Sequence, residues 1–345
     1  MTLKRQLSGC AFLAVISMLA GVAAAQERSD GPRVVARNLD NPTGIAIHSG
    51  TGHIFVADRN GIVRFYRTEG RGLKRAVEIN EFPTDQYGKG PIYDIGPLGI
   101  AFMDDEHLVV GDGSRKDTDE LILVYDIYED PPEEPASADS AEYTLGPLES
   151  TDELKAEGNY YGVAVTDGAI FATANGDDTK GWIVRSLIKD GDPQPLERYI
   201  ATKEAVEVDA PVAITIGPYG DLVVGQAGEV NLPGDSLLTI YDPKTGELKK
   251  SWETGLSDIT GLAFSPETGK LYATDFSWAD PAEGGLFELI IDGDELETRK
   301  VAALDKPTAI AFGRRGSAFV TVFGTAEEGS DNKPGQLLRF RASDL

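Results

Sequence analysis

The chain has 345 residues, a single cysteine, three histidines and a formal net charge of −25. So large a negative charge argues against nucleic acid and anionic lipid as partners, because both would be repelled. It favours cationic partners and divalent metal ions.

The first segment in chain order, residues 1–25, has the features of a secretory signal peptide. Lys4 and Arg5 precede an apolar run, and the segment ends in Ala23-Ala24-Ala25. The apolar run is too short to span a membrane, so we expect cleavage and export to the periplasm or the cell exterior. Cleavage removes the only cysteine, which leaves the mature chain, residues 26–345, without a disulfide or a cysteine nucleophile.

From residue 44 onward one short pattern recurs six times, beginning at residues 44, 99, 162, 213, 261 and 309. Small and apolar residues alternate in it, as in Gly44-Ile45-Ala46-Ile47. Each copy continues with two further strand-like runs and a looser fourth run, and none shows a helical period. The spacing is that of propeller blades. The sequence therefore predicts an all-β fold, a six-bladed β-propeller with four antiparallel strands per blade.

The recurring run should form the innermost strand of each blade. Only Gly, Ala or Thr leaves enough room where six strands converge on the propeller axis. The segment 35–47 closely copies the segment 301–312. We therefore expect residues 34–39 to form the outer strand of the last blade and so to close the ring.

The stretches NPTGIAIHSGTGHIFVAD and ITGLAFSPETGKLYATD resemble NHL repeats, and the whole mature chain resembles the six-bladed propellers of the NHL and SMP-30/gluconolactonase-like group. That group includes hydrolases, lyases and binding modules. For the SMP-30-type enzymes the resemblance implies a divalent metal at the channel mouth, held partly by Asn or Asp directly before the strand-opening Gly. Those positions are Thr43, Leu98, Tyr161, Val212, Thr260 and Thr308, none a carboxylate or a side-chain amide.

Residues 128–143 stand apart from the repeat because they are acidic, proline-rich and without periodicity. They predict a solvated loop on the face opposite the channel mouth, within one propeller domain of residues 26–345. The three histidines, His48, His53 and His107, fall in hairpins on that same opposite face. We interpret them as solvated turn residues, which argues against histidine catalysis at the mouth.

Carboxylates end three equivalent second strands at the predicted mouth: Asp58, Asp112 and Asp275. They have two interpretations. Aspartates at such positions often cap tight turns by accepting backbone N–H groups. Alternatively they form a cation site, since Ca²⁺ and other hard divalent ions prefer several carboxylate oxygens.

Aromatic residues give a second indication of a ligand-binding face. Tyr93, Tyr161 and Trp278, together with Gln226, are expected at the rim of the mouth. Aromatic rings beside carboxylates suit sugars, amines or a peptide, although the same rings could fill the core between blades.

These patterns predict a secreted, monomeric propeller that is a non-catalytic binding or scaffold protein. Its partner would be a small molecule, a sugar or a protein, not nucleic acid and not a membrane. The alternative is a divalent-metal-dependent hydrolase of lactones or esters with an unfamiliar set of metal ligands.

Overall fold

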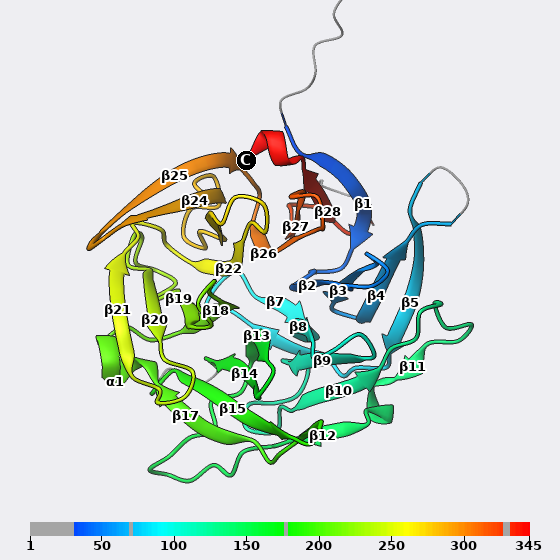
Figure 1. Cartoon of the computed structure of the whole chain (residues 1–345), viewed down its shortest axis with the longest axis horizontal. Coiled ribbons are helices and arrows are strands. Elements are labelled where there is room, and N and C mark those ends of the chain that lie inside the picture. Colours follow the sequence, from blue (N-terminus) through cyan, green and yellow to red (C-terminus); the bar gives the residue numbers. More distant parts are fainter. Residues whose placement is uncertain (1–30, 69–71, 176–178, 327–331) are drawn as a thin grey trace, which may run out of the picture. The chain divides into compact units, whose positions relative to one another are not determined.

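The computed structural model describes residues 31–68, 72–175, 179–326 and 332–345, and the predicted signal peptide lies outside these ranges. Six small antiparallel sheets stand in a ring around a central axis (Figure 1). The chain is a six-bladed β-propeller, which confirms the fold expected from the repeat. No described helix is long and apolar enough to cross a membrane.

The first three blades follow each other along the chain. Blade 1 contains β2 (Gly44–Ile47), β3 (Ile54–Asp58), β4 (Gly61–Tyr66) and β5 (Lys74–Asn80). Blade 2 contains β8 (Pro97–Phe102), β9 (His107–Asp112), β10 (Ile122–Asp126) and β12 (Tyr143–Leu145). Blade 3 contains β13 (Tyr160–Thr166), β14 (Ala169–Ala174), β15 (Trp182–Lys189), β16 (Asp192–Pro193) and β17 (Glu197–Ala201).

The other three blades complete the ring. Helix α1 (Thr202–Val206) precedes blade 4, which contains β18 (Pro211–Ile216), β19 (Leu222–Gln226), β20 (Leu237–Tyr241) and β21 (Leu248–Glu253). Blade 5 contains β22 (Ile259–Phe264), β23 (Leu271–Asp275), β24 (Gly285–Asp292) and β25 (Glu295–Ala303). Blade 6 contains β26 (Pro307–Phe312), β27 (Ala318–Val322), β28 (Gly335–Phe340) and the N-terminal β1 (Arg33–Leu39).

Blade 6 is closed by the N-terminal strand, as the copied segments predict. Strand β1 pairs antiparallel with β28, from Arg33 opposite Arg339 to Leu39 opposite Gly335. Leu39 is fully buried in a core cluster shared with blade 1. The pairing ties the two ends of the described chain together and covers the outer edge of β28.

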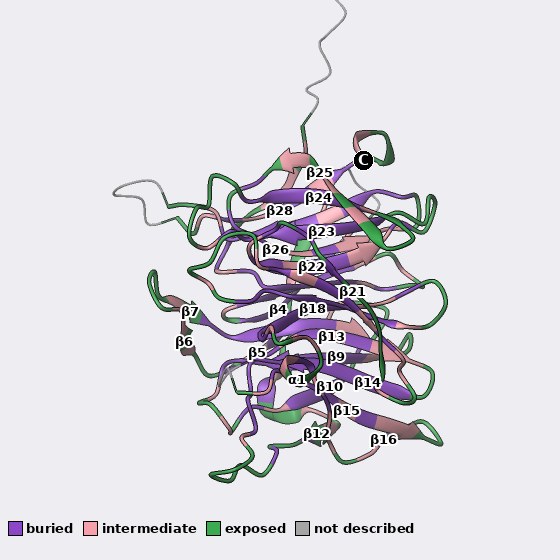
Figure 2. Cartoon of the chain, turned by 90° about the vertical axis from the view of Figure 1, so that its left-hand side faces the viewer, coloured by how far each residue is buried: buried purple, intermediate pink, exposed green. Residues whose placement is uncertain are grey.

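Close packing at the axis explains the small residues of the inner strands. A Cβ on Gly44 would lie 2.2 Å from the Leu98 carbonyl oxygen, and one on Gly99 would lie 2.1 Å from that of Tyr161. The larger apolar residues of each blade pack against the neighbouring blade, as Phe55 of blade 1 and Leu123 of blade 2 do in one cluster. Figure 2, a side view, shows buried strands through the middle of the molecule and exposed loops where the strands end.

The acidic segment 128–143 departs from the expected solvated loop. It contains β11 (Ala136–Ser137), which pairs parallel with β5 of blade 1, and the short helix η1 (Ala138–Ser140). Ala138 is buried, and its carbonyl accepts a hydrogen bond of 2.7 Å from the Tyr125 hydroxyl. The fully buried Arg64 donates to the Tyr128 carbonyl. The segment therefore extends blade 1 across to blade 2, which composition alone could not indicate.

Candidate functional site

A β-hairpin lies over the mouth of the axial channel. It is formed by β6 (Asp85–Tyr87) and β7 (Tyr93–Ile95) in the connection from blade 1 to blade 2. In Figure 1, β7 lies near the centre of the ring, and Figure 2 shows the hairpin on one face. Its tip reaches blade 5, where the Trp278 indole N–H donates to the Gly90 carbonyl at 3.2 Å. The hairpin thus covers the mouth instead of leaving it open.

Aromatic packing holds the hairpin in this position. The Tyr93 ring lies 5.3 Å from Trp278 and 5.2 Å from Phe323, both in edge-on geometry. Phe276 stacks on Trp278 at 5.1 Å. Such pairs add about 0.5–1.5 kcal/mol each beyond the apolar area they bury. Rings from blades 5 and 6 and from the hairpin therefore form one continuous wall.

Beneath the hairpin lies an inner cavity of about 70 Å³. All six residues directly before the strand-opening positions line it: Thr43, Leu98, Tyr161, Val212, Thr260 and Thr308. Its wall is the aromatic cluster of Tyr87, Tyr93, Phe276, Trp278 and Phe323. The sequence-predicted mouth is thus the floor of a largely apolar cavity.

Tyr161 forms part of this floor by reaching across the axis. It comes from blade 3, and its hydroxyl donates a hydrogen bond of 3.1 Å to the Thr308 carbonyl of blade 6. Burial raises the pKa of Tyr161, so the hydroxyl stays protonated and remains a donor. Below it the axial channel continues as a separate cavity of about 240 Å³ lined by the inner strands.

Few polar groups face the inner cavity, and the most unusual is Asp258. Its side chain is buried, with the whole residue 5% exposed, and Oδ2 accepts a 2.5 Å hydrogen bond from the Trp278 backbone amide. Burial raises the pKa of Asp258 to about 7, and the carboxylates of Asp275 and Asp235 act in the same direction. No ion pair to Asp258 is found among the described residues. A cation in the cavity would meet a carboxyl that lacks a counter-charge.

Two asparagines also line the inner cavity. The buried Asn159 has a left-handed backbone, with φ of 54°, and its N–H donates to the buried Glu120 carboxylate at 3.1 Å. Asn175 is also buried, and within the described ranges its Oδ1 has no hydrogen-bond partner. A buried acceptor without a donor costs free energy, and a ligand N–H or an ordered water at this point would remove that cost.

A second cavity of about 170 Å³ adjoins the first and shares five lining residues with it: Tyr87, Asn175, Val212, Ala227 and Val230. Its own lining is more polar and includes Lys89 from the hairpin tip and Glu229 from blade 4, which face each other at 3.8 Å. Asp209 also lines it and pairs with Lys203. This outer cavity therefore borders the inner one on the side of the hairpin tip and blade 4.

The structure places the four predicted ligand-face residues unequally. Tyr93, Tyr161 and Trp278 line the inner cavity together. Gln226 is fully buried in blade 4, where its amide donates to the Val208 carbonyl and accepts from the Tyr241 hydroxyl at 3.3 Å. Gln226 therefore has its polar atoms engaged inside the blade and does not line the cavity.

The three predicted metal-site aspartates each engage the turn beside them. Asp58 accepts from the backbone N–H of Asp40 and Asn60 at 3.1 and 2.9 Å. Asp112 accepts from Ser114 N–H at 2.8 Å and pairs with Arg115.

Asp275 accepts from three backbone amides, those of Ser257, Asp258 and Ser277, at 2.8–3.1 Å. The described chain does not gather Asp58, Asp112 and Asp275 into a group with metal-ligand spacing. Each of the three carboxylates accepts a backbone N–H two residues further on, as the turn-cap interpretation expects, and a cation site shared by them stays a prediction.

Asp258 and Asn159 were not singled out by the sequence, although a signal for them exists. Both stand three residues before a strand-opening Gly, and the other four copies have Asn41, Gly96, Ala210 and Lys306 at the equivalent position. Asn41, Asn159, Ala210 and Lys306 all have positive φ, between 46° and 55°. The repeat thus places a left-handed residue before four of its inner strands. Asp258 occupies the equivalent position without a positive φ, so aligning the six copies would have singled out both residues by position alone.

Comparisons with known proteins support the fold only. No protein-family model and no curated protein matches the chain. Among solved structures, an aldose sugar dehydrogenase from Escherichia coli is 15% identical, with a TM-score of 0.58, covering 90% of this chain and 98% of that one. A glucose dehydrogenase from Thermus thermophilus is 17% identical (TM-score 0.58; 90% and 99% covered). A gluconolactonase from Xanthomonas campestris is 14% identical (TM-score 0.56; 89% of both chains).

Proposed function

We propose that this protein is an exported, non-catalytic binding protein whose ligand is a small organic cation, an amine with an apolar body. The observation that carries the proposal is the buried Asp258 carboxyl, which lies in an aromatic cavity and has no cationic partner among the described residues. The export rests on the signal-peptide pattern of residues 1–25.

The cavity chemistry supports a cation over a neutral ligand. Cations bind over the faces of Trp and Tyr rings, and the inner cavity has Tyr87, Tyr93 and Trp278 in its wall. Asp258 would supply the counter-charge in a site of low polarity, where an ion pair is stronger than in water. The net charge of −25 would also raise the local concentration of cations.

Size limits the ligand. The inner cavity of about 70 Å³ admits an alkylated ammonium group, and the outer cavity of about 170 Å³ admits the rest of a small molecule. Typical drug-sized sites need roughly 300 Å³ or more, so a larger ligand requires the β6–β7 hairpin to move outward.

Tryptophan fluorescence tests the proposal, because Trp278 lies in the wall of the cavity. We expect tetramethylammonium to change the emission in a saturable way, and the neutral isostere neopentane or tert-butanol to bind at least about 10-fold more weakly. The change should vanish in Trp278→Phe and lose its preference for the cation in Asp258→Asn. Equal binding of the neutral and charged probes, or no saturable change, would overturn the proposal.

The second candidate is the metal-dependent hydrolase, and the observation that favours it is the fold likeness to a gluconolactonase. It requires turnover of simple lactones or aryl esters that a chelator abolishes and a divalent ion restores. Chelator-sensitive turnover by the full mature chain would establish this candidate in place of the binding protein.

A further inference from the structure

A separate cluster lies on the opposite face of the ring, in blade 2. His107 begins β9 and Asp126 ends β10, and the two residues are direct partners in the β9–β10 ladder. Glu142 stands directly before β12, and its N–H donates to the Val124 carbonyl at 2.8 Å. Three side chains are thus held on adjoining strands of one sheet, whose backbone fixes their separation.

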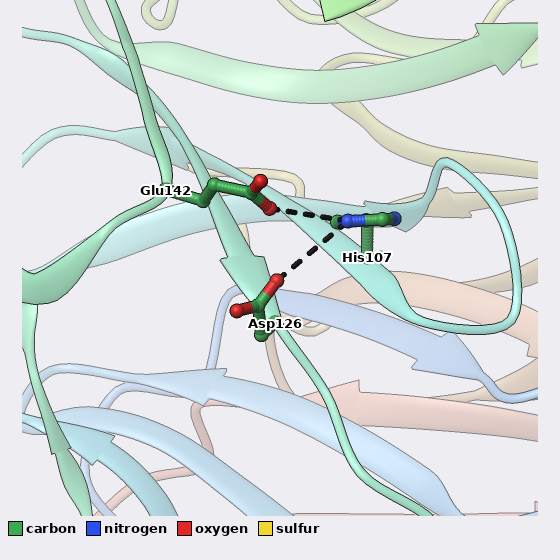
Figure 3. A group of neighbouring side chains, drawn as sticks. All are labelled: His107, Asp126 and Glu142. Carbon is green, nitrogen blue, oxygen red and sulfur yellow. Dashed lines mark ion pairs between the residues drawn. The ribbon is translucent and has the colours of Figure 1, made fainter. Parts of the chain in front are cut away.

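The side chains converge on one point, as Figure 3 shows. His107 Nε2 lies 3.1 Å from Glu142 Oε2 and 3.6 Å from Asp126 Oδ1. One potential ligand atom of each residue lies within 4.8 Å of the other two. Zinc binds His nitrogen and carboxylate oxygen at about 2.0–2.2 Å, so two ligands at a tetrahedral angle are about 3.4 Å apart. The two distances from Nε2 lie on either side of that value.

Asp104 orients the imidazole from the other side. His107 Nδ1 lies 2.8 Å from both carboxylate oxygens of Asp104. Asp104 is itself fixed by the backbone N–H groups of Glu106 and His107, at 2.8 and 2.9 Å. A carboxylate that accepts Nδ1–H leaves Nε2 as the ligand atom, which is the usual arrangement behind a metal-bound histidine.

We propose that His107, Asp126 and Glu142 form a site for a divalent first-row transition metal, with Zn²⁺ as the reference ion. One imidazole and two carboxylates suit such ions better than Ca²⁺ or Mg²⁺, which take oxygen ligands. Asp126 and Glu142 are 53% and 40% exposed, so an ion can reach them from solvent and keep water in its remaining positions.

The site would also have a structural consequence. Asp126 and Glu142 stand at the two ends of the segment 127–141, which carries β11 across to blade 1. A metal bound to both residues would fix the two ends of this segment to β9. Binding to the folded state alone raises stability with metal concentration.

A charged imidazole is the competing explanation for the same geometry. Burial lowers the pKa of His107, but the hydrogen bond and charge of Asp104 and the charges of Glu142 and Asp126 outweigh it and raise the pKa. A protonated His107 would hold the three carboxylates by ion pairing without any metal. The metal site requires that a transition metal binds and that its binding depends on these residues. The ion-pair explanation requires neither.

Isothermal titration of the metal-free, full mature chain with ZnCl₂ distinguishes them. We expect one saturable site, absent in His107→Gln and present in the matched control His53→Gln, which alters another histidine of the same face. Asp104→Asn, a change to a positioning residue, should weaken binding by about 10- to 100-fold without changing the stoichiometry. With Co²⁺, visible d–d absorption should appear in the wild type and not in Glu142→Gln.

Thermal melts of the same variants in EDTA show whether each is folded, and the exposed positions make folding of the variants expected. Zn²⁺ should raise the melting temperature of the wild type and of His53→Gln, and leave that of His107→Gln unchanged. No saturable binding, or equal binding by wild type and His107→Gln, would overturn the metal site and leave the ion-pair cluster. Neither result bears on the cavity at the channel mouth.

Discussion

The two faces of the propeller use carboxylates in opposite ways. At the channel mouth Asp258 is buried among aromatic rings, and the hydrogen bond from Trp278 N–H only partly offsets the cost of its charge. On the opposite face Asp104, Asp126 and Glu142 lie in or near water and surround His107. Burial thus raises the free energy of the charged Asp258 carboxyl, which a bound cation would lower again. Carboxylates exposed to water keep their charge with little loss of stability.

The largest expected effect on stability comes from removing the Tyr161 ring, which forms the floor of the inner cavity. Tyr161→Ala should lower the free energy of unfolding by about 3 kcal/mol, because it removes a large ring and joins the inner cavity to the axial channel. Tyr161→Phe keeps the ring and loses only the hydrogen bond to Thr308, so it should cost about 1 kcal/mol. Urea unfolding measures both, and equal losses would mean that the ring does not separate the cavities.

A second prediction concerns the cost of the buried charge. Because the pKa of Asp258 is raised to about 7 in the folded state, from its ordinary value of 3.8, the folded protein binds more protons than the unfolded chain between these values. Its stability should therefore fall as pH rises from about 4 through 7. Asp258→Asn should reduce this fall, to which Glu120 also contributes, and stabilise the protein by about 2 kcal/mol at pH 8, with little gain at pH 4.

The matched control for that prediction is Glu120→Gln. Burial raises the pKa of Glu120 to about 7 as well, but Glu120 does not line the inner cavity. Both variants should gain stability at high pH, and only Asp258→Asn should lose cation binding. Loss of binding in both would show that the cavity responds to any nearby charge and not to Asp258 itself.

Binding at the mouth should also depend on pH. Tetramethylammonium carries a permanent positive charge, so the ionisation of Asp258 decides the interaction. Affinity for tetramethylammonium should rise by roughly 10-fold from pH 6 to pH 8, and Asp258→Asn should flatten the profile. Emission titrations at constant ionic strength measure this, and a flat wild-type profile would contradict the assignment.

The smallest effect is expected on the opposite face. Without metal, His107→Gln should change the free energy of unfolding by no more than about 1 kcal/mol, since exposed ion pairs contribute little. A loss of several kcal/mol in chemical unfolding with EDTA present would show that this face, too, depends on a buried charge.

The sequence by itself determined the ring. The alternation of small and apolar residues in six copies predicts strands packed around one axis. The similar segments near the two ends of the chain predict that β1 closes the last blade. Both are properties of neighbouring residues, which a repeat preserves. Tyr161 directly precedes a strand-opening Gly, so its place at the mouth follows from the same register.

Only the tertiary structure decided what lies over and between the blades. The β6–β7 hairpin reaches Trp278 from 188 residues away in sequence, and Tyr161 reaches Thr308 from 147 residues away. Asp58, Asp112 and Asp275 share a strand position, yet the backbone N–H groups around each one determine its role. His107 lies beside Asp126 and Glu142 because β9, β10 and the residues before β12 are neighbours in blade 2. A repeat shows which residues occupy equivalent positions. Contacts between loops that are not equivalent depend on the side chains of both loops, and the spacing of a repeat does not predict those side chains.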